Sequence, residues 1–167
     1  MTRLRFPIRR FLLVLTTWPL ICATSSALTV FLREAEALST ANDVILLHAA
    51  AGWIAALIWF SLDRLLIRRF ERLSARFVLS FTLLIGLTVG VSAGLFAIQF
   101  WVYFSQWHEP LTSRIGLYQA IFTSASAIYQ YAVLGARHLI VLALPAAALF
   151  ASIAARHPHI EAREPIR

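Results

Sequence analysis

Long apolar runs separated by short charged segments make up most of this chain. A helix of about 20 apolar residues is long enough to cross the hydrocarbon core of a bilayer. The last run contains Arg137 and His138 near its start, so its apolar part is nearer to residues 139–155. The pattern predicts an all-α integral membrane protein with four transmembrane helices. The predicted spans cover about residues 11–32, 44–62, 77–104 and 132–155.

The connection between spans two and three has a helical pattern of its own. Arg64, Arg68, Arg72 and Arg76 recur at every fourth residue, which places them on one face of a helix. This predicts a basic amphipathic helix over residues 63–76 that lies on the inner surface of the membrane. Its arginines are expected to contact anionic lipid headgroups or, as the alternative, an acidic partner protein.

The segment over residues 105–131 is the longest piece between two spans. Pro110 separates it from span three, and apolar residues then return at helical spacing. This stripe predicts an outer interfacial helix, either separate from span four or continuous with it. Its members are Leu117, Ile121, Phe122, Ala125, Ile128 and Tyr129.

The arginines predict how the spans are oriented. With four spans, twelve of the fifteen Arg residues fall on one side of the membrane. The positive-inside rule therefore places both termini in the cytoplasm. The predicted regions are a basic cytoplasmic N-terminus (1–10), a four-span bundle (11–155) and a cytoplasmic tail (156–167), in a bacterial-type inner (plasma) membrane. The first residues also resemble a secretory signal peptide, but the apolar run continues to Leu32 and favours a retained span.

Charge and cysteine content exclude two classes of function. A net charge of +7 and a pI near 11.0 would indicate a nucleic-acid partner in a soluble protein. Here the basic residues flank the spans, where anionic lipid headgroups account for them, and no nucleic-acid partner is expected. Cys22 is the only cysteine, so paired-cysteine redox chemistry is excluded.

Spans three and four both carry small residues at every fourth position. Such a stripe, a glycine zipper when it consists of glycines, lets two helix backbones approach closely. It predicts a tight helix contact, either inside the bundle or between subunits of a homo-oligomer or with a membrane-protein partner. The residues are Gly86, Gly90 and Gly94 in span three and Ala143, Ala147 and Ala151 in span four.

Two histidines suggest a cofactor site. His48 and His138 enter spans two and four from the same side, so they are expected at similar depth. A pair of axial histidines at one depth can hold a b-type haem in a helical bundle, and Gly52, one turn from His48, would leave room for the ring. The simpler interpretation is a hydrogen-bonded histidine at each position, with no cofactor.

Two other motifs suggest catalysis or metal binding. Residues 90–94 match the G-x-S-x-G pattern of serine hydrolases, with Ser92 as the nucleophile and His138 as a candidate base. That motif requires a strand–turn–helix elbow, whereas this segment is predicted to be helical. His157 and His159 in the tail are two possible metal ligands, but no third ligand lies nearby in the sequence.

The sequence therefore favours a non-enzymatic protein. We expect a structural, accessory or transport-associated subunit that acts by helix packing, without a cofactor or metal. A b-type haem electron carrier is the alternative, and an intramembrane hydrolase is the third. No acidic residue or arginine lies deep in spans one to three, which argues against a proton-driven carrier.

Pro19 and Pro145 predict kinks in spans one and four.

Overall fold

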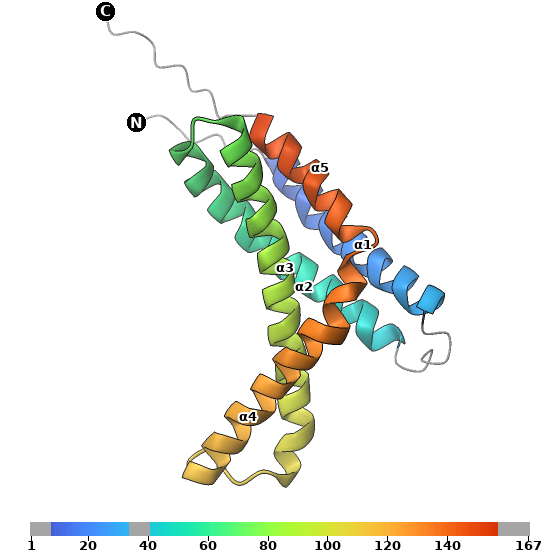
Figure 1. Ribbon diagram of the computed structural model, residues 1–167, viewed down its shortest axis with the longest axis vertical. Helices are drawn as coiled ribbons and strands as arrows, with labels where there is room; N and C mark the ends of the chain where they lie inside the picture. The colour runs from blue at the N-terminus through green and yellow to red at the C-terminus, as the bar shows by residue number, and fades with distance from the viewer. Residues whose placement is uncertain (1–7, 34–40, 157–167) are drawn as a thin grey trace, which may run out of the picture.

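The computed structural model describes residues 8–33 and 41–156, and the regular structure in these ranges is helical. Short 3₁₀ or π segments lie at Ile67–Arg69 (η2), Ser105–Trp107 (η3), Tyr131–Gly135 (η4) and Ala136–Leu139 (η5). Figure 1 shows the five α-helices: α1 (Ile8–Arg33), α2 (Ala41–Leu66), α3 (Leu73–Phe104), α4 (Arg114–Gln130) and α5 (Ala143–Arg156).

Three of these helices are long and apolar enough to cross a membrane by themselves. They are α1, α2 and α3, and the bent pair that ends in α5 raises the number to four when it is taken as one span. The length and hydropathy of the helices thus make the chain a multi-pass membrane protein. This confirms the all-helical, membrane-spanning architecture that the apolar pattern predicts.

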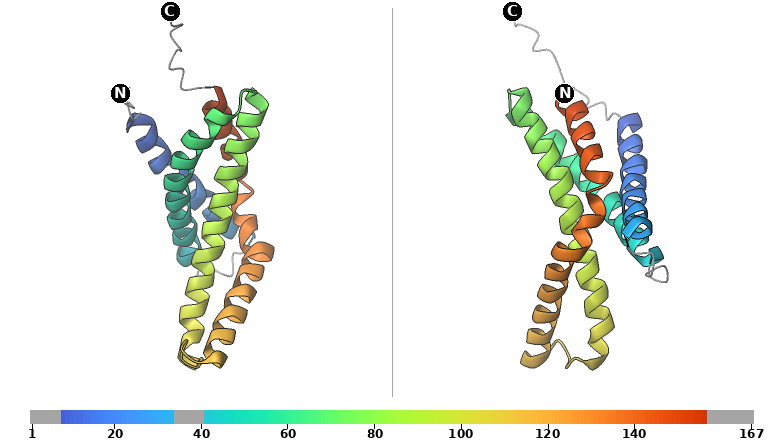
Figure 2. Two further views of the ribbon diagram at one scale, coloured as in Figure 1. Left: turned by 90° about the vertical axis from the view of Figure 1, so that its left-hand side faces the viewer. Right: turned by 45° about the vertical axis from the view of Figure 1, so that its right-hand side comes forward.

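The basic ends of the helices gather at one end of the molecule. The start of α1, the end of α5 and the connection from α2 to α3 lie together there (Figures 1 and 2). This end contains Arg10, Arg64, Arg76 and Arg156. If the bent pair is taken as one span, four crossings place these basic segments on one side of the membrane, which is the arrangement that the distribution of arginines predicts.

The core lies where α1, α2, α3 and α5 meet. Trp18 of α1 is fully buried, and its indole Nε1 donates a hydrogen bond to Thr88 Oγ1 of α3 at 3.1 Å. Trp59 of α2 donates from Nε1 to the Ser80 carbonyl oxygen, also at 3.1 Å. Because each indole N–H has a partner, two large side chains fill the core without an unsatisfied polar group.

The prediction of one amphipathic helix over residues 63–76 is wrong. Helix α2 continues to Leu66, and Phe70 and Arg72 have extended backbones before α3 begins (ψ 130° and 131°). The reason is that α2 and α3 pack along each other. A fourteen-residue helix between them, about 21 Å long, would hold them apart. Instead, Arg76 Nε donates to the Phe70 carbonyl at 2.7 Å and closes a tight turn.

Helix α4 does not lie along the membrane surface, as the apolar stripe had suggested. It runs antiparallel to the second half of α3, and this α3–α4 hairpin extends beyond α1 and α2 (Figures 1 and 2). Its turn is well organised: the Ser113 side chain caps the Gly116 N–H at 2.9 Å. A Cβ atom on Gly116 would collide with the carbonyl oxygens of Glu109 and Pro110. The compact turn brings α4 back onto α3.

Helix α4 is connected to α5 by further helical turns, but the two helices are not continuous. The chain runs from α4 through η4 and η5, breaks at residues 140–142 and bends by 71° into α5. Pro145 lies in the first turn of α5, where its missing N–H has no intrahelical partner to lose. The break at residues 140–142 lies three to five residues before Pro145, so span four is bent near this proline, as the sequence predicts.

Candidate functional site

A cluster of buried polar side chains lies beside the break between α4 and α5. Each of its members comes from a different segment of the chain. The cluster consists of His48 in α2, Ser92 in α3, Tyr131 in η4 and His138 in η5. Burial of four polar side chains is unfavourable unless they bond to one another or to the backbone.

Hydrogen bonds fix the orientation of the His48 ring. Its Nδ1 lies 2.8 Å from the carbonyl oxygen of Val44, which can only accept, so Nδ1 carries the proton. Nε2 is then left as the acceptor, and the Tyr131 hydroxyl donates to it at 3.2 Å. The neutral imidazole thus has both ring nitrogens satisfied, as expected for a histidine at membrane depth.

The structure brings His48 and His138 together, as their matched depth predicts. Their ring centroids are 5.4 Å apart, and the Tyr131 ring lies 5.9 Å from that of His48. A haem between two axial histidines needs a free nitrogen on each ring and flat space between them. Here His48 Nε2 bonds to Tyr131, and the two imidazoles pack against each other. This arrangement does not fit a porphyrin.

Gly52 serves a different purpose from the one proposed for it. A Cβ atom at Gly52 would lie 3.0 Å from both Cys22 Sγ and Pro19 Cα of α1. The missing side chain therefore allows α1 and α2 to approach closely. It leaves no room beside His48 for a flat ring.

The G-x-S-x-G segment lies within α3, which is helical throughout. The strand–turn–helix elbow of serine hydrolases is therefore absent from it. Ser92 is fully buried, and its hydroxyl is close to the Tyr131 side chain without forming a hydrogen bond of good geometry. A serine nucleophile requires a base within hydrogen-bond reach, and the group beside Ser92 is a phenol. The geometry gives no support to a hydrolase.

Two residues that sequence reasoning missed hold this region together. The Tyr131 ring lies over Gly135, where a Cβ atom would collide with it. Ser25 of α1 bonds to the broken backbone itself: its hydroxyl donates to the His138 carbonyl oxygen at 2.7 Å and accepts from the Leu142 N–H at 3.1 Å. Ser25 stands between Thr24 and Ser26, and nothing in the sequence distinguishes it from these polar neighbours.

The alanine stripe forms a close helix contact, but the glycines do not take part in it. Ala143, Ala147 and Ala151 are fully buried, and α5 packs against α3. The face of α3 that is buried contains Ser80, Leu84, Thr88 and Ser92.

Gly86, Gly90 and Gly94 lie on a different face of α3. A Cβ atom on any of the three would have no neighbour within 4 Å. They are offset by two residues from the buried face, which is about 200° around a helix. Of the two expected locations for the glycine zipper, a contact inside the bundle is therefore excluded for the described residues.

The four arginines predicted to line one helical face are split by the turn. Arg64 lies in the last turn of α2, over the Phe60 ring at 5.5 Å, whereas Arg72 and Arg76 lie at the start of α3. Arg68 lies in η2 between them. They share one end of the molecule, but they do not form a single stripe.

No group of three or more metal-ligating side chains occurs in the described ranges, and His157 and His159 lie outside them. Comparison with known proteins finds no similarity: no family model, no curated protein and no solved structure matches this chain.

Proposed function

We propose that this protein is a non-enzymatic subunit of a bacterial-type inner membrane, with both termini cytoplasmic, that binds another transmembrane helix through α3. The binding face is formed by Thr82, Gly86 and Gly90, which we call the glycine face. The partner is a second copy of this chain or another membrane protein. This role does not require a cofactor or a catalytic group.

The observation that carries this proposal is the exposure of the glycine face. Other small residues at helical spacing in the bundle are buried, including Ala51 and Ala55 of α2 and Ala143 and Ala147 of α5. Thr82, Gly86 and Gly90 are exposed. Small residues at this spacing gain nothing from lipid contact, but they allow a helix to approach within the distance that van der Waals packing requires.

Cysteine cross-linking in membranes tests the proposal directly. Cys22 is the only cysteine and is replaced by Ala, after which Gly90→Cys gives a single reactive thiol on the glycine face. We expect rapid oxidative formation of a disulfide-linked dimer, or of an adduct with a partner protein. Leu149→Cys, on the exposed side of α5, is the matched control and should cross-link slowly. Equal rates at the two positions would contradict the proposal.

The break between α4 and α5 supports the transport-associated form of this function. Backbone without helical hydrogen bonds is tolerated at membrane depth only where protein groups or water satisfy it. The Ser25 hydroxyl supplies such a group here. A His138→Cys variant lacking Cys22 tests whether water reaches this point. A water-soluble thiol reagent should modify it if the break lines a path, and should leave it unmodified if the break is purely structural.

A further inference from the structure

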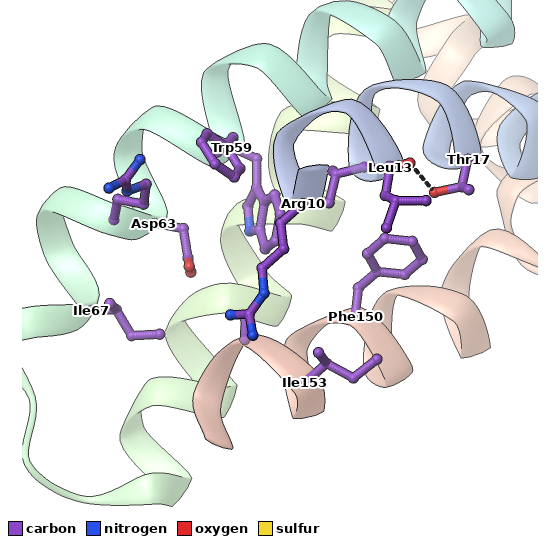
Figure 3. Close-up of a pocket in the computed structure, with 12 residues that line it drawn as sticks. Arg10, Leu13, Thr17, Trp59, Asp63, Ile67, Phe150 and Ile153 are labelled. Carbon is purple, nitrogen blue, oxygen red and sulfur yellow. Dashed lines mark hydrogen bonds between the residues drawn. The ribbon is translucent and has the colours of Figure 1, made fainter. Parts of the chain in front are cut away.

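A pocket of about 440 Å³ opens between α1, α2 and α5 at the basic end of the molecule. Its walls are mostly apolar, with Leu13 and Thr17 from α1 and Phe150 and Ile153 from α5 (Figure 3). The volume lies within the range of about 300–1,000 Å³ that is usual for small-molecule sites. Because the pocket lies at the end of membrane-spanning helices, lipid molecules have direct access to it.

Asp63 is the unusual residue in this pocket. It is only 7% exposed, and its Oδ1 atom has no hydrogen-bond partner among the described residues. Ser80 of α3 is close enough to interact with this carboxyl group, but its hydroxyl does not form a hydrogen bond of good geometry either. A buried carboxylate oxygen without a donor costs several kcal/mol. Asp63 is therefore positioned to accept a hydrogen bond from a ligand.

Two arginines complete the polar part of the pocket. Figure 3 shows the Arg10 guanidinium of α1 and the Asp63 carboxyl group of α2 extending into the same opening. Arg64, the residue after Asp63, also lines the pocket. The polar end thus combines one acceptor that lacks a donor with two cations that can bind an anion, and both lie above an apolar wall.

We propose that this pocket binds one phospholipid with a primary ammonium headgroup, of the phosphatidylethanolamine type. The ammonium donates to Asp63 Oδ1, the phosphate lies between Arg10 and Arg64, and an acyl chain follows Leu13, Thr17 and Phe150. A primary ammonium has three N–H donors, whereas the trimethylated headgroup of phosphatidylcholine has none. An anionic headgroup such as phosphatidylglycerol matches the arginines but places no positive charge at Asp63.

Native mass spectrometry of the full-length protein with added lipids tests this proposal. Four probes are compared: phosphatidylethanolamine, its N-monomethyl derivative, phosphatidylcholine and phosphatidylglycerol, all with the same acyl chains. We expect one tightly retained phosphatidylethanolamine, somewhat weaker binding of the monomethyl lipid, and at least tenfold weaker binding of phosphatidylcholine. Equal retention of phosphatidylethanolamine and phosphatidylcholine would overturn the proposal. Preferential binding of phosphatidylglycerol would also overturn it.

Substitutions of pocket residues test which side chain recognises the ammonium and which recognises the phosphate. Asp63→Asn should reduce the preference for phosphatidylethanolamine over phosphatidylcholine to less than about threefold. Arg10→Gln should weaken the binding of both lipids to a similar extent, because both carry the phosphate. Arg9→Gln changes an exposed neighbour outside the pocket. It is the matched control and should not change the binding of either lipid. An unchanged preference in Asp63→Asn would refute the role of Asp63. If that variant fails to fold, the methylation series on the wild-type protein still decides the question.

Discussion

The Ser25 hydroxyl of α1 accepts the backbone N–H of Leu142 at 3.1 Å, across a separation of 117 residues in sequence. The same hydroxyl donates to the His138 carbonyl oxygen at 2.7 Å and also accepts from the Ala143 N–H at 3.4 Å. One side chain thus supplies both a donor and an acceptor to a backbone that has lost its helical partners. In lipid no water can take this place, so the bend between η5 and α5 depends on α1.

Removal of the Ser25 hydroxyl should therefore destabilise the bundle. We expect Ser25→Ala to lower the free energy of unfolding by about 1–3 kcal/mol, because it leaves backbone groups buried and unsatisfied. Thermal unfolding in detergent measures the effect. Thr24→Ala is the matched control: this side chain is exposed and bonds within α1 to the Leu20 carbonyl. Equal stability of the two variants would show that the break has other partners.

Gly135 should tolerate no side chain while Tyr131 is present. In Gly135→Ala the new methyl group collides with the Tyr131 ring, and we expect a loss of about 1–3 kcal/mol from overpacking. The double variant Gly135→Ala/Tyr131→Ala should show a much smaller additional loss, since the ring is gone. Gly94→Ala, where the methyl group meets open space, should be neutral. If the stability losses of Gly135→Ala and Tyr131→Ala simply add in the double variant, the new methyl group does not collide with the Tyr131 ring.

The glycine face and the alanine stripe should respond differently to a large side chain. Gly90→Leu should leave the unfolding temperature of the isolated protein unchanged, because no atom lies within 4 Å of the added Cβ. In the Gly90→Cys variant, a Gly86→Leu substitution on the same face should abolish cross-linking. Ala147→Leu should destabilise the bundle by about 1–3 kcal/mol, because Ala147 is fully buried. Destabilisation of the purified monomer by Gly90→Leu would place the glycines inside the fold.

The polar cluster should not bind haem. Protein purified from haem-replete cells, or mixed with haem, is expected to lack the sharp low-spin bands of bis-histidine ligation. The reason is that Tyr131 occupies the Nε2 atom of His48 and the two imidazoles are already in contact. An absorbance spectrum of the reduced protein decides this. Bands that disappear in both His48→Ala and His138→Ala would restore the haem interpretation.

Reporter fusions test the orientation. Alkaline phosphatase, which is active only outside the cytoplasm, should be active when fused after Pro110 in the α3–α4 turn. Fusions after Arg72, which precedes α3, and after Arg156, which ends α5, should be inactive, because the start of α3 and the end of α5 lie at the same end of the molecule (Figure 1). Activity of the fusion after Arg156 would require an odd number of crossings.

The apolar pattern was sufficient to predict the spanning helices but not how they turn. Hydropathy located α1, α2 and α3, because a bilayer imposes length and composition on any helix that crosses it. The turn at Phe70–Arg72 was missed, because arginines at every fourth residue suit a helix and the need for α2 and α3 to pack is not visible locally. A bend near Pro145 was predicted, but the position of the break at residues 140–142 was not, because Ile140, Val141 and Leu142 are apolar and contain no helix breaker themselves.

The candidate site was predicted only in part for the same physical reason. The proximity of His48 and His138 followed from depth, which can be counted along a helix. The contributions of Ser25, Tyr131 and Gly135 depend on which helix faces which, and the sequence gives no such information. The glycines of α3 were recognised as a close-packing motif, but spacing alone cannot distinguish a buried stripe from an exposed one. Ser80 and Thr88, on the buried face, are also small.

The length of α3 sets how far the turn of the hairpin stands from the membrane. From Arg76 to Phe104 it runs about 42 Å at ~1.5 Å per residue, whereas crossing a core of ~30 Å at the usual tilt of ~20° takes about 32 Å. About two turns are therefore expected beyond the hydrocarbon, and the rings of Tyr103, Phe104 and Trp107 pack together at this end of the hairpin. A water-soluble protein on that side can reach the segment from Glu109 to Ser113 without entering lipid. Each residue inserted into or deleted from α3 would change its height by about 1.5 Å.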